Sequence, residues 1–258
     1  MTTTTTTRST PGPRRPRLAG LYAIADLKGA AASDDEVEAM LALLGERPSG
    51  AGPSALQLRA KAASTAARIE CLRRLAGPCA DAGVLLLVND DVEAALAGPP
   101  GVVGVHLGQE DLGPADAHVE GIRSIRARAE AAGRSDLVVG VSTHDLEQVA
   151  RASGLPIDYV GFGPIFATAT KIDHDPVVGL DGLNAAVQRS RHPVVAIGGL
   201  DPARARLAVE AGATAAAMIS ALLRSSSAAT RAHVAEVARD LEAVASSALI
   251  GRSMIELS

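Results

Sequence analysis

Short, almost wholly apolar runs alternate along the chain with longer segments rich in Ala, Leu, Glu and Arg. An apolar run of this kind is typical of a parallel strand that is covered on both faces. Eight such runs are present, at residues 18–26, 55–60, 84–90, 101–108, 137–143, 159–165, 193–199 and 215–220. The pattern therefore predicts eight parallel strands.

The segments between the runs carry helix signals. Residues 64–82 place apolar side chains at helical spacing, namely Ala67, Cys71, Leu72 and Leu75. Residues 202–211 follow Asp201, a typical N-cap, and begin with a proline. Residues 222–247 are predicted to form a last, longer helix. Strand and helix alternating in this way predict one α/β domain, a closed (β/α)8 TIM barrel over residues 18–247. An open doubly wound sheet is the alternative, but no Gly-x-Gly-x-x-Gly follows the first run.

Composition narrows the classes of function. The chain has 258 residues and 47% of them are hydrophobic, which is enough to bury the core of a single barrel of ~250 residues. The formal net charge of −4 argues against broad nucleic-acid binding, which depends on phosphate neutralisation. Aromatic residues make up only 2%, so stacking on bases is not expected. No apolar run reaches the ~18 residues that span a membrane. We expect neither a nucleic-acid nor a membrane partner.

Both ends of the chain are predicted to lie outside the barrel. Residues 1–17 are rich in Thr, Pro and Arg and are predicted to be a disordered basic tail. Residues 248–258 are assigned to a C-terminal tail. The first residues lack the apolar stretch of a secretory signal. Cys71 and Cys79 fit no zinc or redox spacing, and two free thiols suit the reducing cytoplasm. A homo-oligomer is left open.

Polar residues follow the apolar runs with unusual consistency, and in a TIM barrel the carboxyl ends of the strands carry the active site. The residues at these ends are Gln57, Arg59 and Lys61, Asn89 and Asp90, His106, Gln109, Glu110 and Asp111, Ser142 and Thr143, Thr168, Thr170 and Lys171, Gly198 and Gly199, and Ser220. Cations together with two carboxylates that could share a Mg²⁺ ion predict a diphosphate site. The small residues after the last two strands suit a phosphate held by backbone N–H groups.

Each of these residues also has a purely structural explanation. The competing explanations are inward polar layers of the barrel for Gln57 and Arg59, a helix cap for Asn89 and Asp90, a capping box for Ser142 and Asp145, a tight turn for Gly198 and Gly199, and a buried structural role for His106. The remaining histidines without evident partners are predicted to lie on the surface: His118, His174, His192 and His233. The functional reading rests on the recurrence of polar groups at one structural level on consecutive strands.

Several of these segments also match a known family. They are LQLRAK (56–61), VND (88–90), GVHLGQEDL (104–112), VGVSTHDLEQVARA (139–152), DYVGFGPIFATATK (158–171), VVAIGGL (194–200) and AGATAAAMISAL (211–222). In this order and spacing, the chain resembles the thiamine-phosphate synthase family over residues 20–222. GVHLGQED and GFGPIF-x-T-x-TK are the most specific pair.

The resemblance implies a set of site residues. The pyrimidine diphosphate would be held by Gln57, Leu58, Arg59, Ala60, Lys61, Asn89, Ser142 and Lys171. Arg59, Lys61, Ser142 and Lys171 would act in catalysis. Asp90 and Asp111 would bind Mg²⁺. The thiazole phosphate would be held by Thr168, Ala169, Thr170, Gly199, Ile219 and Ser220.

The chain departs from the family's usual motifs at a few positions. Ala60 and Asp91 stand where the family commonly has Glu and Arg. Ala167 and Ala169 replace the two prolines of a typical PTPTK loop. None of these changes removes a side chain with an assigned role, but losing both prolines should leave the loop after the sixth strand more flexible when it is empty.

The resemblance implies a transferase, a thiamine-phosphate diphosphorylase of thiamine biosynthesis. Its small-molecule substrates would be 4-amino-2-methyl-5-(diphosphooxymethyl)pyrimidine and a thiazole phosphate or its carboxylated form, with pyrophosphate released. Two other functions are considered. A thiazole tautomerase shares the barrel but handles no diphosphate, so it should not need the charged set. An inactive ligand-binding barrel would be supported only by the basic tail.

Overall fold

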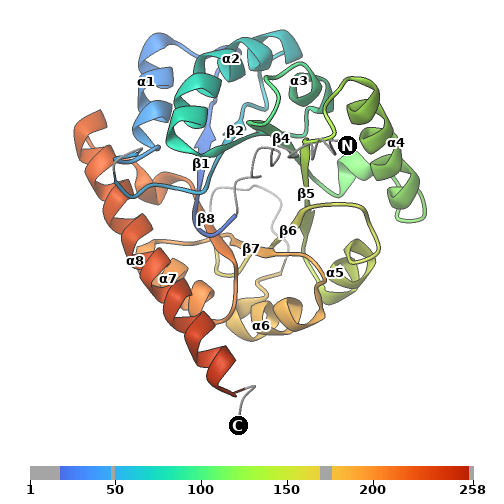
Figure 1. Cartoon of the computed structure of the whole chain (residues 1–258), viewed down its shortest axis with the longest axis vertical. Helices are drawn as coiled ribbons and strands as arrows, with labels where there is room; N and C mark the ends of the chain where they lie inside the picture. Colours follow the sequence, from blue (N-terminus) through green and yellow to red (C-terminus); the bar gives the residue numbers. More distant parts are fainter. Residues whose placement is uncertain (1–17, 48–49, 169–175, 256–258) are drawn as a thin grey trace, which may run out of the picture.

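The eight apolar runs form eight parallel strands that close into one barrel in the computed structural model (Figure 1). The structure describes residues 18–47, 50–168 and 176–255. Each strand pairs with its neighbours in sequence, and the last strand pairs with the first. The predicted α/β TIM barrel is confirmed, and the open doubly wound sheet is wrong.

All strands lie within the predicted runs and are shorter than them. The strands are β1 (Gly20–Asp26), β2 (Ala55–Arg59), β3 (Leu85–Asn89), β4 (Val103–Leu107), β5 (Val138–Thr143), β6 (Tyr159–Phe162), β7 (Val194–Ile197) and β8 (Ala215–Met218). The helices are α1 (Asp34–Ala42), α2 (Thr65–Ala82), α3 (Val92–Leu96), α4 (His118–Ala131), α5 (Leu146–Ala152), α6 (Gly179–Arg189), α7 (Pro202–Glu210) and α8 (Ser227–Ile255), with short 3-10 turns η1 (Glu110–Leu112) and η2 (Ser220–Leu222). The last helix extends past its predicted end at residue 247.

Two separate apolar cores hold the barrel together, because successive strand residues point to opposite faces of the sheet. The outer core lies between the strands and the ring of helices seen in Figure 1, and it includes Leu56, Leu58, Leu86 and Val88. The inner core fills the barrel itself and includes Tyr22, Ile24, Leu85, Leu87 and Tyr159. The interior of the barrel is therefore a packed core and not a pore.

The helix caps settle two of the competing explanations. Asp91 caps α3, because its side chain accepts from the N–H of Ala94. Asp145 caps α5 by accepting from the N–H of Gln148. Asn89, Asp90 and Ser142 therefore cap no helix, and their side chains are available at the barrel rim. Within the described residues, no helix combines the length and hydropathy needed to cross a membrane.

Candidate active site

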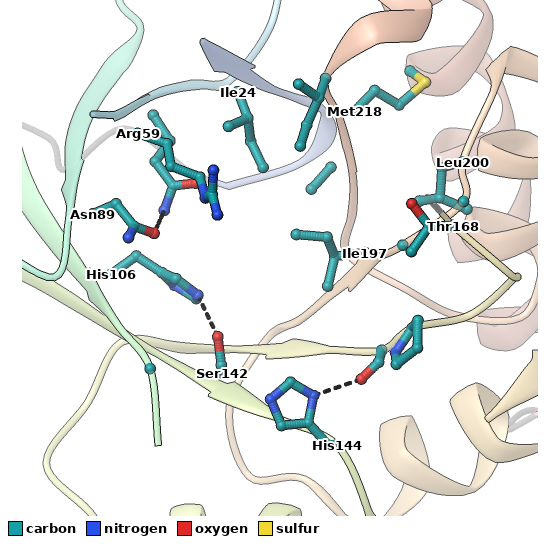
Figure 2. Close-up of a pocket in the computed structure, with 18 of the residues that line it drawn as sticks. Ile24, Arg59, Asn89, His106, Ser142, His144, Thr168, Ile197, Leu200 and Met218 are labelled. Carbon is teal, nitrogen blue, oxygen red and sulfur yellow. Dashed lines mark hydrogen bonds between the residues drawn. The ribbon is translucent and has the colours of Figure 1, made fainter. Parts of the chain in front are cut away.

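A cavity of about 460 Å³ opens at the carboxyl ends of the strands. Most of the site residues predicted from the sequence line it: Gln57, Arg59, Lys61, Asn89, Asp90, Ser142, Thr168, Gly199, Ile219 and Ser220. Figure 2 shows that they fall into two groups. Arg59, Asn89 and Ser142 lie on one wall, and Thr168 lies on the wall opposite. Strands far apart in the sequence thus bring these side chains to one hollow.

Other predicted site residues lie elsewhere. The side chains of Leu58 and Ala60 are buried in the outer core, so only their backbone is near the cavity. Asp111 does not line the cavity, but its carboxylate accepts from the N–H of Gly108, which does. The predicted residues Ala169, Thr170 and Lys171 lie outside the described residues.

Arg59 is held in place by a carboxylate at the end of β1. Its guanidinium lies 2.7 Å from Asp26, which also accepts from the Lys28 ammonium at 2.5 Å. Burial opposes the ionisation of Asp26, but the hydrogen bonds from Lys28 and Arg59 outweigh it and lower the pKa of Asp26. Asp26 therefore stays charged and restrains the guanidinium, whose remaining donors can face a bound anion.

Two carboxylates meet where β3 and β4 end. The Asp90 carboxylate hydrogen-bonds to Asp111 and accepts from the side-chain amide of Asn89. Asp90 also has a positive φ of 64°, which is rare for a residue with a side chain and is typical of functional positions. Burial, then the hydrogen bond with Asp111, then the charge of Asp111 raise the pKa of Asp90 to about 7.

This pair of carboxylates fits a divalent cation. In the described residues no three His, Cys, Asp or Glu side chains converge as metal ligands. Mg²⁺, however, typically takes only one or two carboxylates and completes its shell with water and substrate phosphates. The mutual repulsion of Asp90 and Asp111 is the kind of strain that a bound cation relieves. The Lys61 ammonium, which also favours the charged form of Asp90, lines the same wall.

His106 and Ser142 form the lower part of this wall. The ring Nε2 of His106 lies 3.0 Å from Oγ of Ser142, and Nδ1 lies 2.9 Å from the Tyr159 hydroxyl (Figure 2 shows the first contact). Burial, with a smaller contribution from His144, lowers the pKa of His106 to about 4. His106 is therefore neutral near pH 7. It is both hydrogen-bonded in the core and exposed to the cavity.

The opposite wall is built from backbone. Gly198 and Gly199 end β7 with φ of 97° and 65°, and the loop after β6 is bonded to them, with the Phe166 N–H donating to the Gly198 carbonyl at 3.1 Å. A Cβ on Gly199 would lie 2.6 Å from the carbonyl oxygens of both Phe166 and Ala167. Gly198-Gly199 is thus a tight turn, as the structural explanation held, and it also lines the cavity.

The sequence reasoning missed several residues at this rim. Asp26 ends a strand with a polar side chain, so the signal that identified Asp90 could have identified it. His144 lines the cavity, and its ring Nδ1 bonds to the Gly163 carbonyl at 2.7 Å. Arg204 donates to the Gly199 carbonyl at 2.9 Å and lies 5.0 Å over the Phe166 ring, and no local signal predicts that contact.

The prediction that the remaining histidines lie on the surface is wrong for His118. Its side chain is buried and donates from Nε2 to the Gly113 carbonyl at 3.0 Å. His233 is half-buried against Arg224, and His192 is half-buried too. His174 lies outside the described residues.

The chain is similar to several known proteins. Residues 21–222 match the family described as "Thiamine monophosphate synthase". The thiamine-phosphate synthase of Koribacter versatilis is 43% identical over 140 residues, which are 54% of this chain and 60% of that relative, so the match spans less than two thirds of its length. The Methanocella arvoryzae thiamine-phosphate synthase is 34% identical over 79% of this chain and 86% of its own. Thiamine phosphate pyrophosphorylase from Pyrococcus furiosus has a similar structure, with a TM-score of 0.66 and 31% identity over 91% of this chain and 98% of that one.

Proposed function

Because the chain belongs to the thiamine monophosphate synthase family, a family of transferases, we propose that it joins the pyrimidine diphosphate to a thiazole phosphate and releases pyrophosphate. The thiazole substrate is either 4-methyl-5-(2-phosphooxyethyl)thiazole or its carboxylated form. The observation that carries the proposal is that one cavity has two different walls. The charged wall carries Arg59, Lys61 and Asp90, and the backbone wall is formed around Gly198 and Gly199. Two phosphorylated substrates with different charges would each have a matching wall.

The charged wall suits the diphosphate. Arg59 presents a planar fork of donors and Lys61 a mobile point charge, and both favour phosphate oxygens. Gln57 and Asn89 are bonded to each other at 3.4 Å and add neutral donors beside them. Lys171, which follows Thr170 in the sequence and lies outside the described residues, would add a third cation. Leu58 and Ala60 would contribute backbone groups only.

Asp90 and Asp111 would hold Mg²⁺ against the diphosphate. When bound, the cation neutralises charge on the departing pyrophosphate. The carboxylates of this chain, at the ends of β3 and β4 near Lys61, would be the groups that hold it. The positive φ of Asp90 orients its carboxylate toward Asp111 and into the cavity.

The backbone wall suits the thiazole phosphate. Gly199, Ile219 and Ser220 line it, and glycines with positive φ let backbone N–H groups approach an anion closely. Phosphate sites formed after the seventh and eighth strands recur in TIM barrels. Thr168, with the expected Ala169 and Thr170, would close this wall from the loop after β6.

The reaction then needs little covalent help from the protein. The bond between the methylene carbon and the diphosphate oxygen breaks, and its electron pair leaves with pyrophosphate. The electron-rich aminopyrimidine stabilises the methylene cation until the thiazole nitrogen attacks that carbon. Arg59, Lys61, Ser142 and Lys171 would stabilise the charge that develops on the leaving group, and the two walls would supply orientation.

A turnover assay with both purified substrates and Mg²⁺ tests this function. We expect thiamine phosphate and pyrophosphate in equal amounts, with neither formed when one substrate is left out. Isomerisation of a thiazole phosphate without consumption of the pyrimidine would indicate the tautomerase instead. Binding of both substrates without any product would indicate a ligand-binding barrel.

The partners and the cellular compartment of the protein are part of the same proposal. Its partners would be the two small substrates, with no nucleic acid and no membrane. Cys71 and Cys79 are buried free thiols in the structure, which fits a reducing cytoplasm.

A further inference from the structure

Four polar side chains form a row of consecutive hydrogen bonds, here called the file, from the barrel interior to the charged wall. The hydroxyls of Tyr22 and Tyr159 lie 3.1 Å apart, and the Tyr159 hydroxyl lies 2.9 Å from Nδ1 of His106. The other ring nitrogen, Nε2, lies 3.0 Å from Oγ of Ser142, as Figure 2 shows. Ser142 ends the file at the cavity, which the His106 ring also lines, and Tyr22 is at the buried end.

The buried end of this file lies in apolar surroundings. Tyr22 is 2% exposed and Tyr159 is fully buried, and both belong to the inner core with Leu85, Leu87 and Val138. Gly140 admits the Tyr159 ring, because a Cβ there would lie 2.1 Å from the ring Cζ. Two phenols in this core each need a hydrogen-bond partner, and the file supplies one.

The number of protons in the file determines which group donates and which accepts in each of its hydrogen bonds. We call this order the direction of the file. In one direction Tyr22 donates to Tyr159, Tyr159 donates to Nδ1 of His106, and Nε2–H donates to Ser142. The Ser142 proton is then free to point into the cavity. Every buried proton in the file has an acceptor in this arrangement.

The opposite direction leaves a proton without an acceptor. Ser142 would donate to Nε2, Nδ1–H to Tyr159, and Tyr159 to Tyr22. The Tyr22 proton would then be buried with no acceptor among the described residues, which disfavours this arrangement by about 10-fold or more in population. A charged imidazolium would leave the same proton unpaired and would also bury a charge. Only the first direction satisfies the whole file.

We propose that Tyr159 and His106 are positioning residues that turn the Ser142 hydroxyl into a hydrogen-bond donor facing the cavity. The inference rests on the proposed function, in which Ser142 contacts the diphosphate. A diphosphate oxygen only accepts hydrogen bonds, so a serine in the opposite direction would present lone pairs to it. Tyr22 merely ends the file, because without it the opposite direction would leave the Tyr159 proton unpaired instead.

The tautomer of His106 tests the direction without any turnover. In protein labelled with ¹⁵N-histidine, two-bond ¹H–¹⁵N spectra distinguish the protonated ring nitrogen, and the missing signal of His106→Gln assigns the residue. We expect the proton on Nε2 at pH 7.5. A proton on Nδ1 would overturn the proposal, whatever the protein's activity.

A double-mutant cycle tests whether Tyr159 acts through Ser142. Inorganic pyrophosphate with Mg²⁺ is titrated into wild type, Tyr159→Phe, Ser142→Ala and the double variant by calorimetry. Tyr159→Phe should raise the Kd about 5-fold alone and by less than about 2-fold in the Ser142→Ala background. Equal effects in both backgrounds would show a merely structural tyrosine and overturn the proposal.

Tyr22→Phe is the matched control for this cycle. It removes a phenol from the same inner core but leaves the direction of the file unchanged, so the Kd for pyrophosphate should stay within about 2-fold of wild type. If Tyr159→Phe does not fold, the wild-type tautomer still decides the direction. A Tyr22→Phe protein with His106 protonated on Nδ1 would contradict the proton count.

Discussion

The two walls of the cavity offer different groups to a phosphate. The charged wall, formed where β2 to β5 end, lines the cavity with the side chains of Arg59, Lys61, Asn89 and Asp90. The backbone wall, formed where β6 to β8 end, presents glycines and small residues instead. The charged wall should therefore be sensitive to the loss of charge and the backbone wall to added bulk. Substitutions that remove charge from the charged wall or add bulk to the backbone wall can test this comparison.

Removing one carboxylate from the charged wall should have the largest effect. Asp90→Asn keeps the size of the side chain but removes a charge that would hold Mg²⁺, so kcat/KM should fall on the order of 10²-fold or more. Initial rates over a Mg²⁺ titration measure this effect. Asp116→Asn, at an exposed aspartate that does not line the cavity, is the control and should behave as wild type. Full activity of Asp90→Asn in EDTA-treated buffer would disprove the metal assignment.

Adding bulk to the backbone wall should have the next largest effect. The Cβ of Gly199→Ala would clash with two carbonyl oxygens at 2.6 Å and strain a φ of 65°. We expect the KM for the thiazole phosphate to rise about 10-fold, with the KM for the pyrimidine diphosphate nearly unchanged. Gly83→Ala is the matched control, because Gly83 has the same φ of 65° but nothing within 4 Å of the new Cβ. Equal changes in both KM values for Gly199→Ala would remove the distinction between the walls.

The fold was largely predictable from the sequence, because parallel strands covered on both faces are almost wholly apolar. Each strand is shorter than its predicted run, because apolar residues also continue into the flanking loops. The last helix was predicted to end at residue 247, but α8 runs to Ile255. That end carries no Gly or Pro stop signal before Gly251, so local pattern alone could not locate it.

The charged wall was easier to predict than the backbone wall. Polar side chains at strand ends are visible in the sequence, and Asn89 and Ser142 were found in this way. The contacts that hold other site residues join strands that are separated in the sequence. Asp26 on β1 contacts its register partner Arg59 on β2, and Tyr159 on β6 contacts His106 on β4. The pairing and packing of the strands bring these residues together, so no local spacing could predict the contacts.

Two residues of the loop after β6 can separate the walls further. Thr168→Ala removes one neutral donor near the backbone wall, so the KM for the thiazole phosphate should rise about 5-fold with little change in kcat. Lys171→Ala removes a charge that, under the proposed function, would act on the departing pyrophosphate, so it should mainly lower kcat. Steady-state kinetics with one substrate varied at a time measure both. A Lys171→Ala enzyme with normal kcat and a changed thiazole KM would contradict this division of the loop.

The smallest expected effect is a pH dependence of stability that belongs to the charged wall alone. Burial and repulsion by Asp111 raise the pKa of Asp90 to about 7 from 3.8, so the folded protein holds an extra proton between these values. In metal-free protein this contribution to stability is complete below about pH 4 and is lost as the pH rises through 7. Because a partly exposed pair is screened by solvent, we expect a loss of about 1 kcal/mol.

Urea unfolding of EDTA-treated protein at pH 4.5 and pH 8 measures this loss. Asp90→Asn cannot ionise, so it should match wild type at the lower pH and be the more stable protein at the higher pH. Asp111→Asn should have a similar effect, because it removes the repulsion that raises the pKa of Asp90. Comparing variants cancels other groups, including Asp26, whose lowered pKa contributes with the opposite sign. Gly199→Ala changes no charge, so its unfolding free energy should shift equally at both pH values. Parallel pH profiles for wild type and Asp90→Asn would show that the pKa of Asp90 is not raised in the folded protein.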